Sequence, residues 1–565
     1  MTDTKEMANA TQIEDTVHER DIEASPHRSA AQLEIVEPAP NRSTTDYPGG
    51  FDKAAAFLKQ ADHQVVVTHS DSRRVLRRID WRLMPIMLVI YCLQSLDKNT
   101  LSYASVFSLI DDTGLKGDQY SWLGSVVYLA QLVFQPLIAY ILVKFPIGKF
   151  LAFMVFAWGA ILCGMTAAHN FTGLLIARLF LGIFEAAIAP TFVAIVQMWY
   201  RRREQTTRNA AWYAMLGIIN IFGSLLTYGL GHASSSVLRP YQIIFLFAGC
   251  LTVAWSIVTL IFMPDSPMTA KFLKGDDKLI AIERLRMNQQ GIVAGVWKWS
   301  HVWEALLDVK TWLWFCLMFI ISLAAGADRK ISIPSGGIST FGPLIIQSFG
   351  FDSFTTILFN IPFGAVQIIA TLGGAWLSDK IKMKFPVLIL LCLGPIAGCS
   401  ILLAVGRGVS DRGVLLFGYY IISIYPGISP LIYSWSGQNT AGDTKRKVTT
   451  GFLFVGSNAG NVIGPLLFRP DEKPRYTRGL TANLVLFILL AVLVGLGALW
   501  IKFLNAKHAK ARVALGKPGK IVDLSMADAK DKGNEDVLNQ AADHVGERAF
   551  EDLTDLQNED FIYVY

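Results

Sequence analysis

Two charged residues interrupt an otherwise apolar stretch from Ala177 to Pro190, and their types and spacing could do chemistry. Arg178 and Glu185 are seven residues apart. This spacing is close to two turns of an α-helix, so both side chains would lie on one helical face. A charge at membrane depth costs about 3 kcal/mol on insertion scales, and it is usually kept where it handles a substrate or a proton. We therefore interpret this face as a candidate site for an anion and a proton.

A second charged pair, Asp97 and Lys98, lies at a similar predicted depth. Asp97 is fifteen residues into its apolar segment, or about 22 Å from the cytosolic start of the helix, and Arg178 would lie about 21 Å above the inner membrane surface. Asp97 and Arg178 could therefore meet across a central cavity, with Glu185 about 10 Å deeper. A substrate carboxylate that engages Arg178 would leave Glu185 or Asp97 readier to bind a proton.

Purely structural roles are the alternative for these charges. Asp97 could form an ion pair with Lys98 or Arg178, and Arg178 could pair with Glu185 to hold two helices together. Lys98 could instead extend toward the outer membrane interface. Three further polar residues in apolar segments are candidates for substrate binding, although each of them could simply bond a neighbouring helix. They are Gln131, Asn360 and Asn439.

The composition predicts an all-α polytopic membrane protein. Of the 565 residues, 52% are hydrophobic and only 17% are charged, and the mean hydropathy is +0.39. The net charge is +6, but the basic residues form short clusters between apolar runs, which disfavours nucleic-acid binding. The six cysteines form no CxxC pair, and we find no phosphate-binding loop or hydrolase motif. We expect no enzyme activity, no cofactor and no metal.

Twelve apolar segments are long enough to cross a bilayer. They lie near Arg82–Ser102, Tyr120–Val143, Gly148–Ala168, Thr172–Trp199, Asn209–Gly231, Tyr241–Met263, Thr311–Ile346, Phe354–Leu377, Pro386–Gly406, Val414–Trp435, Val448–Phe468 and Leu480–Phe503. Lys and Arg gather in alternate loops, which predicts that both termini are cytosolic.

The segments divide the chain into five predicted regions. They are a disordered cytosolic tail (1–79), an N-terminal six-helix half (80–263), a cytosolic central loop (264–310), a C-terminal six-helix half (311–503) and a largely mobile cytosolic tail (504–565). Leu279, Ile282 and Leu285 recur at helical spacing in the central loop, which predicts an amphipathic helix on the membrane surface.

Two segments are interrupted. Thr311–Ile346 spans 36 residues and contains Asp328–Lys330, which predicts either a broken helix that lines the cavity or a local insertion. Pro426 and Gly427 interrupt the tenth segment, where a gating hinge is a reasonable hypothesis. Asp379 and Lys380 follow the eighth segment and are candidate gating charges.

Several motifs together resemble the major facilitator superfamily, and within it the anion:cation symporter group and the fungal allantoate permease family. The resemblance covers about residues 73 to 565. The motifs that carry it are Leu96-Asp97-Lys98-Asn99-Thr100, Arg178-x-x-x-Gly182-x-x-Glu185, Trp199-Tyr200-x-x-x-Glu204-Gln205-x-x-Arg208, Trp435-x-x-x-Asn439, Gly460-Asn461-x-x-Gly464-Pro465 and Asp552-Leu553-Thr554-Asp555-x-x-Asn558. One departure is Phe145, which replaces the acidic residue of the superfamily's loop between the second and third helices.

The resemblance implies two six-helix halves that alternate in access to a central site. It implies proton-coupled uptake of a small carboxylate-bearing nutrient or vitamin, such as allantoate, ureidosuccinate, nicotinate or pantothenate. Asp97 and Glu185 would couple the proton, and Lys98 and Arg178 would bind the anion. We expect a protein of the plasma membrane that functions as a monomer. A transporter of a secondary metabolite and a nutrient sensor with a transporter fold remain the alternatives.

Overall fold

The computed structural model describes residues 52–61, 65, 67–106, 109–116, 119–231, 238–325, 360–406, 409–464, 477–521, 523, 525–526 and 548–565. All of them belong to one compact unit, Tyr47–Tyr565. These residues form α-helices and short 3-10 helices, and none of the described segments is a strand. The expectation of an all-helical protein is thus confirmed for this part of the chain.

Eight α-helices correspond to the predicted N-terminal half. They are α2 (His69–Val106), α4 (Gln119–Lys144), α5 (Ile147–Gly164), α6 (Phe171–Glu185), α7 (Ile188–Trp199), α8 (Arg202–Tyr213), α9 (Met215–Gly231) and α10 (Pro240–Phe262). Seven correspond to the C-terminal half. They are α13 (Val309–Ala325), α16 (Asn360–Ile381), α17 (Phe385–Ala404), α18 (Arg412–Ile422), α19 (Ile428–Gln438), α20 (Asp443–Ile463) and α21 (Thr477–Ala514).

Shorter helices lie between and before these. The α-helices are α1 (Lys53–Lys59), α3 (Leu109–Thr113), α11 (Asp276–Glu283) and α12 (Trp299–Leu307), and the 3-10 helices are η1 (Met165–Ala167), η2 (Arg286–Asn288), η3 (Val409–Asp411) and η4 (Tyr425–Gly427).

Nine helices among the described residues are long and apolar enough to cross a membrane, and the bent pair α12 and α13, which meet at 66°, would make ten. The other two predicted segments coincide with α9 and α20, both of which are helical. Twelve crossings with cytosolic termini stay a prediction. The interruption at Asp328–Lys330 lies outside the described residues.

The structure corrects the boundaries of both predicted tails. The predicted disordered N-terminal tail contains α1 and the first turns of α2. Asp52 is 1% exposed, caps α1 by accepting a hydrogen bond from the Ala54 N–H, and accepts another from Val293 in the central loop. At the other end, α21 runs to Ala514, and residues 548–565, hereafter the C-terminal segment, contain mostly buried or half-buried side chains. Buried polar contacts hold these parts in place.

The amphipathic helix of the central loop also differs from the prediction. α11 turns Ile280 and Ile282 into the protein and packs on α2, where Asp277 pairs with Arg74 at 3.1 Å and with Arg78. The helix with an exposed apolar face is α12 instead. The acidic first turn of α11 pairs with basic residues of α2, and these pairs hold α11 against the protein. The indole rings of α12 remain exposed on the surface.

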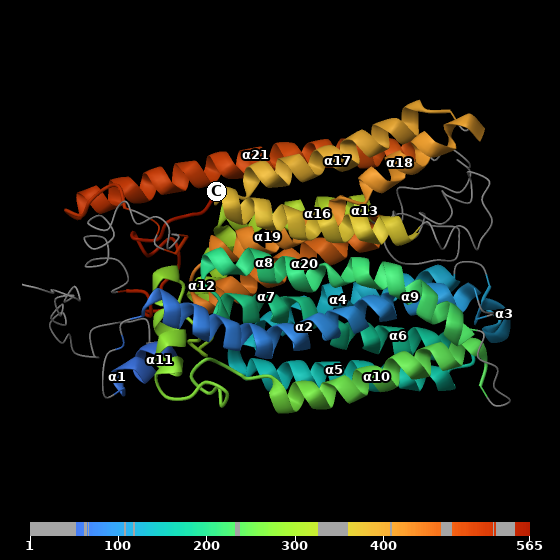
Figure 1. Ribbon diagram of the computed structural model, residues 1–565, viewed down its shortest axis with the longest axis horizontal. Coiled ribbons are helices and arrows are strands. Elements are labelled where there is room, and N and C mark those ends of the chain that lie inside the picture. Colours follow the sequence, from blue (N-terminus) through green and yellow to red (C-terminus); the bar gives the residue numbers. More distant parts are fainter. Residues whose placement is uncertain are drawn as a thin grey trace, which may run out of the picture. The chain divides into compact units, whose positions relative to one another are not determined.

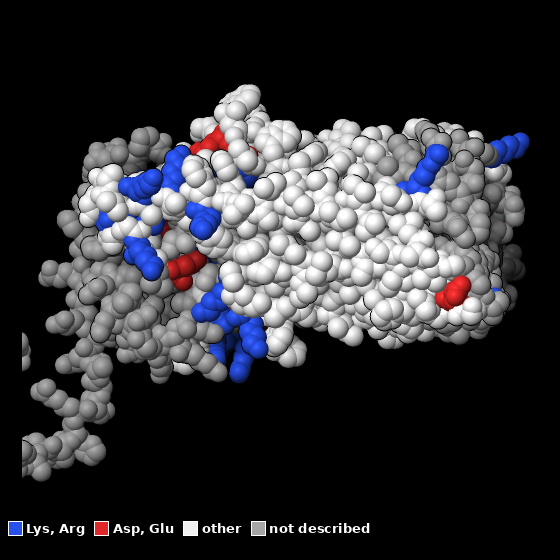
Figure 2. Space-filling model, turned by 90° about the horizontal axis from the view of Figure 1, so that it is seen from above, with Lys and Arg blue, Asp and Glu red and all other residues white. Residues whose placement is uncertain are grey.

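Helices from the two halves pack directly on one another. α4 contacts α20, and α9 and α8 both contact α16. In Figure 1 most of the helices up to α10 lie in the lower part of the view and most of those from α13 onward in the upper part, with α8 and α20 at the boundary. Figure 2 shows Lys and Arg side chains gathered mainly at one end, while the long middle surface is free of charge on the visible face. This distribution is typical of a bundle that crosses a bilayer.

Two glycines allow a close approach of backbones between the halves. A Cβ atom on Gly217 of α9 would lie 2.7 Å from the carbonyl oxygen of Gly364 on α16, and a Cβ on Gly364 would lie 2.7 Å from the carbonyl oxygen of Gly217. The helix backbones therefore touch at a point where any side chain would separate them.

We expect Gly364→Ala to weaken this packing by about 1–3 kcal/mol, because an overpacked contact forces the backbones apart. The measurement is the Tm of the purified protein together with its transport rate. Gly373→Ala is the matched control on the same helix, because a Cβ there meets nothing within 4 Å. Equal effects of the two substitutions would contradict the predicted role of the Gly217–Gly364 contact.

Candidate functional site

Glu185 lies at a break in the fourth predicted span. α6 ends at Glu185, and α7 begins at Ile188 after the turn residues Ala186 and Ala187. Pro190 explains the break, because proline has no N–H to donate to the carbonyl of Ala186 and its ring crowds that carbonyl. The acidic side chain is thus held at a discontinuity in the middle of a membrane-length helix pair.

The Glu185 carboxylate lies against the side chains of Gln131, Lys98 and Gln94. Gln131 of α4 donates a hydrogen bond from Nε2 to Glu185 Oε2 at 3.2 Å, and Lys98 Nζ of α2 lies 3.7 Å from Glu185 Oε1. Oε1 accepts no hydrogen bond from any described residue. Glu185 is 2% exposed, whereas the Lys98 side chain is 33% exposed. The ion pair therefore joins a buried acid to a cation that is still accessible.

Asp97 is held more completely. Trp158 of α5 donates from Nε1 to Asp97 Oδ2 at 2.8 Å, and the Thr100 hydroxyl donates to Asp97 Oδ1 at 3.1 Å. Asp97 is only 1% exposed. The single hydrogen of the Thr100 hydroxyl is shared with the Asp97 backbone carbonyl, which lies closer at 2.6 Å, so Trp158 is the main donor to this carboxylate. The contact with Trp158 ties α2 to α5.

Arg178 is buried without a salt bridge among the described residues. It is 4% exposed, and its Nε and Nη2 atoms have no hydrogen-bond acceptor there. Its charge acts electrostatically on both Asp97 and Glu185. A buried guanidinium with unused donors is costly unless an anion satisfies it. The planar donor geometry of arginine fits a carboxylate.

An aromatic layer lies beside these charges, formed by Tyr91, Trp212, Tyr213 and Tyr433. The ring centroids of Tyr91 and Trp212 are 4.7 Å apart, and those of Trp212 and Tyr433 are 5.8 Å apart in a stacked arrangement. Tyr433 belongs to α19 of the C-terminal half and the other three residues belong to α2 and α8. The layer therefore joins the two halves at this level.

One end of the bundle holds Arg202, Lys310 and Lys445, and we call it the basic end. The C-terminal segment lies at this end. The buried carboxylate of Asp555 forms ion pairs with Lys310 and with Lys445 Nζ, the latter at 2.9 Å. Arg202, the first residue of α8, donates to the carbonyl of Ile562 at 2.9 Å. The segment thus contacts both halves on one side of the aromatic layer. Tyr91 precedes Asp97 by six residues, or about 9 Å along α2 toward this end.

The structure brings together five of the predicted site residues. Asp97, Lys98, Gln131, Arg178 and Glu185 lie in one group, as their predicted depths suggested for Asp97 and Arg178. The side chain of Asn360, the first residue of α16, lies outside the described part of the structure.

Asn439 lies elsewhere, at the basic end. Its Nδ2 donates to the Val564 carbonyl at 2.9 Å, and its Oδ1 accepts from the Val564 N–H at 2.7 Å. The amide therefore holds the C-terminal segment, and it does not join the charged group. This contact satisfies both backbone groups of a buried residue, which gives the side chain a structural role.

The predicted gating residues lie at two positions. Asp379 accepts a hydrogen bond from Thr207 of the other half and lies 3.5 Å from Lys384 Nζ, while Lys380 Nζ lies 5.0 Å from the ring centroid of Trp376. Pro426 and Gly427 form η4, which separates α18 from α19. The predicted break of the tenth span is therefore present, and its use as a hinge stays a prediction.

Sequence reasoning missed Trp158, Thr100 and the aromatic layer. A buried indole N–H in an apolar helix usually needs a hydrogen-bond acceptor. This need could have predicted a polar partner for Trp158. No local pattern identifies the partners of Tyr433, because its ring contacts come from other helices.

A bundle of membrane-length helices with a buried group of charges near the boundary of two halves defines the class of polytopic membrane transporters. Residues 87–465 match the sequence profile of the Major Facilitator Superfamily, and the chain belongs to this family.

Two known relatives and one solved structure are similar to this chain in sequence or in fold. The chain is 30% identical to the thiamine pathway transporter of Saccharomyces cerevisiae over 88% of its length and 87% of that protein. It is 28% identical to the allantoate permease of the same organism, over 89% of this chain and 94% of that protein. Its fold is similar to that of the proton:xylose symporter XylE, with a TM-score of 0.55 and 12% identity over 75% of this chain and 95% of that one.

Proposed function

We propose that this protein is a proton-coupled symporter that takes up a small organic anion bearing a carboxylate. The observation that carries the proposal is Arg178, a buried cation with unused donors next to the accessible Lys98–Glu185 pair. An incoming carboxylate would satisfy the guanidinium with a bidentate contact. A purely apolar substrate would leave the same donors unpaired, and a neutral sugar would leave the buried charge without a counter-charge, which disfavours both.

Glu185 is the better candidate for the proton carrier of the two acids. The Asp97 carboxylate accepts a hydrogen bond of 2.8 Å from the Trp158 indole, and this donor stabilises the charged form of Asp97. Glu185 Oε1 accepts no short hydrogen bond and lies 3.7 Å from the Lys98 ammonium group, which remains accessible. When an anion neutralises Lys98 or Arg178, less positive charge remains to stabilise the Glu185 carboxylate, and proton binding becomes easier.

The same coupling gives the order of events by alternating access. Substrate and proton enter together from one side, because each stabilises the binding of the other by linkage. The contacts of the aromatic layer and of the C-terminal segment join the two halves, which supports an assignment of the basic end as the closed one. By the positive-inside rule the basic end is cytosolic, so the arrangement corresponds to a state closed toward the cytosol. Asp97 acts as a positioning residue between α2 and α5.

The name of one relative supports the substrate class. Allantoate, the substrate in the name of the yeast permease, is a carboxylate, and one arginine would also suit ureidosuccinate, nicotinate or pantothenate. The proposed location is the plasma membrane, with uptake driven by the proton gradient. Uptake of labelled carboxylates from this set into cells that express the protein should rise as the outside medium is acidified. Uptake that is independent of pH for every transported acid would refute the coupling.

We expect Arg178→Gln to raise the half-saturation concentration for the transported acid about 10- to 100-fold. A hydrogen bond to a charged group contributes about 1.5–3 kcal/mol, and each 1.4 kcal/mol is tenfold in affinity. Arg178→Lys should recover only part of the loss, since lysine cannot form the bidentate contact. The control is Arg412→Gln, at the start of α18 and outside the charged group. An unchanged half-saturation concentration in Arg178→Gln would remove Arg178 from the substrate site.

A nutrient sensor is the alternative from a different class. Counterflow of a labelled acid in proteoliposomes separates the two functions, because a sensor binds the acid without moving it. Flux through the purified full-length protein would exclude a pure sensor.

A further inference from the structure

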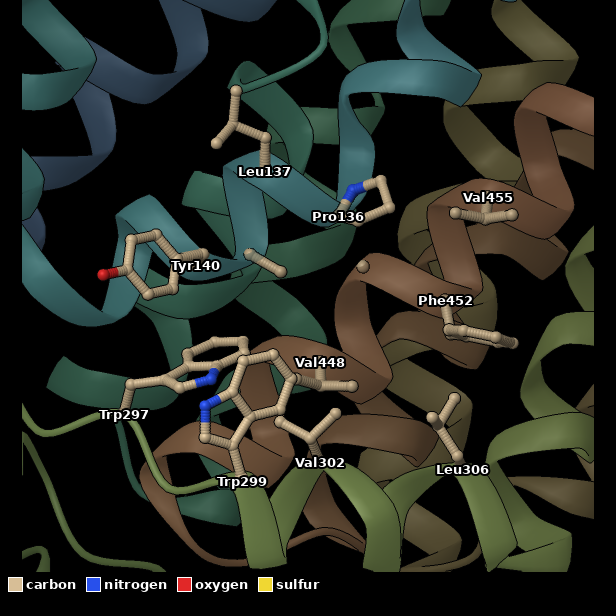
Figure 3. Close-up of a pocket in the computed structure, with 12 residues that line it drawn as sticks. Pro136, Leu137, Tyr140, Trp297, Trp299, Val302, Leu306, Val448, Phe452 and Val455 are labelled. Carbon is tan, nitrogen blue, oxygen red and sulfur yellow. The ribbon is translucent and has the colours of Figure 1, made fainter.

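An apolar groove opens between the two halves close to the basic end. Its volume is about 440 Å³, within the range of ligand pockets of about 300–1,000 Å³. It is bounded by Pro136 and Tyr140 of α4, by Val448 and Phe452 of α20, and by the loop and helix that carry Trp297 and Trp299. Figure 3 shows the rings of Trp297 and Trp299 lying together, with Tyr140 on one side and Val448 on the other.

The groove faces the bilayer. Leu137, which lines it, is 49% exposed, and Tyr140 is 41% exposed. The adjoining helix α12 presents Trp299, Trp303 and Leu307 at intervals of four residues, and these side chains are 66%, 62% and 81% exposed. Such a stripe follows one face of a helix. Exposed tryptophans of this kind are typical of the membrane–water boundary.

We propose that this groove binds an acyl chain of a membrane phospholipid whose phosphate lies near Lys144. Lys144 is exposed at the end of α4, four residues after Tyr140 and therefore on the same helical face. A basic residue at this depth attracts an anionic headgroup. The rings of Trp297 and Trp299, whose centroids are 5.8 Å apart, form one wall against which an acyl chain would pack.

A lipid bound in this groove would affect transport because the groove lies between the two halves. α4 belongs to one half and α20 to the other, and the two helices are in direct contact beside the groove, where a Cβ on Gly451 would lie 3.2 Å from the Ala139 side chain. A chain bound across this boundary favours the present arrangement of the halves over one in which they have rotated apart. This inference concerns lipid and does not depend on which acid the protein carries.

The test uses the full-length protein in nanodiscs that contain a phosphatidylserine with a diazirine on its acyl chain. After irradiation, mass spectrometry should find the label on the groove segments of α4, α12 and α20. Leu137→Trp should lower this labelling about tenfold, as expected when a ring displaces about two buried methylene groups. The matched control is Val133→Trp, one turn earlier on α4, which is 65% exposed and does not line the groove.

A second variant keeps the test decisive if Leu137→Trp does not fold. Lys144→Gln should lower labelling by the phosphatidylserine probe about fivefold, the effect of about one lost basic contact at a membrane surface, and should leave labelling by a phosphatidylcholine probe unchanged. Equal labelling of the groove and of membrane-facing Leu499 on α21 would mean that only unselective lipid surrounds the protein, and it would overturn the proposal. Labelling by a photoreactive sterol or by a photoreactive substrate acid alone would also overturn it.

Discussion

Glu185→Gln is expected to abolish proton-driven accumulation of the substrate while leaving exchange of substrate intact. With one proton coupled to each anion, a gradient of one pH unit supports about tenfold accumulation, because one unit corresponds to about 1.36 kcal/mol. Glutamine keeps the hydrogen bond with Gln131 available but cannot take up the proton. Accumulation should therefore fall to about onefold. The measurement compares uptake under an imposed pH gradient with counterflow in the absence of a gradient.

The control for this experiment is Glu283→Gln, which removes an acidic side chain that pairs with Arg286 in the central loop. It should accumulate the substrate as the unmodified protein does. Accumulation that persists in Glu185→Gln and disappears in Asp97→Asn would reassign the proton to Asp97. If both variants lose counterflow as well, the acids are needed for binding or folding and not specifically for coupling.

Asp555→Asn is expected to release the C-terminal segment from the basic end. Asp555 is fully buried between Lys310 and Lys445, and removing one partner of a buried ion pair costs about 3–5 kcal/mol. Local opening of the segment should increase at least about 100-fold. Limited proteolysis at residues 548–565 measures this opening, and we expect the transport rate to fall because the cytosol-closed state loses its bridge between the halves.

The pH dependence of this contact has a definite sign. Burial alone would raise the pKa of Asp555, but the charges of Lys310 and Lys445 hold the pKa of this carboxyl well below its ordinary value of 3.8. A carboxyl with a lowered pKa contributes stability that is fully present above the unfolded pKa and is lost as the pH falls further. The contribution of Asp555 to the protection of the C-terminal segment should therefore be constant from pH 5 to pH 8 and decline only below about pH 4.

Asp560→Asn is the matched control in the same segment. Asp560 pairs with Lys517, whose side chain is 35% exposed, and such a pair is worth about 1 kcal/mol or less. Proteolysis that increases equally in the two variants would show that Asp555 has no special place in holding the segment.

The sequence predicted the helical class and most of the helix positions because long apolar runs leave few other structures in a bilayer. It also identified the charged group, since Arg178 and Glu185 are conspicuous in an apolar helix and Asp97 lies at a calculable depth. A helix has a fixed rise per residue, so depth along the membrane can be computed from numbering alone. The break after Glu185 follows from Pro190 for a similarly local reason.

Contacts between helices could not be obtained in this way, because they depend on how each helix is rotated about its axis. Lys98 reaches Glu185, and Trp158 instead of a charged group satisfies Asp97. The C-terminal segment reads as a polar tail in the sequence, yet Asp555 is buried, because Lys310 and Lys445 come from two other helices to meet it. The sequence by itself thus determined a helical membrane protein with an arginine and two acids at its centre. Only the tertiary structure decided which of those acids pairs with Lys98, and where the C-terminal segment is held, since both depend on partners far apart in the chain.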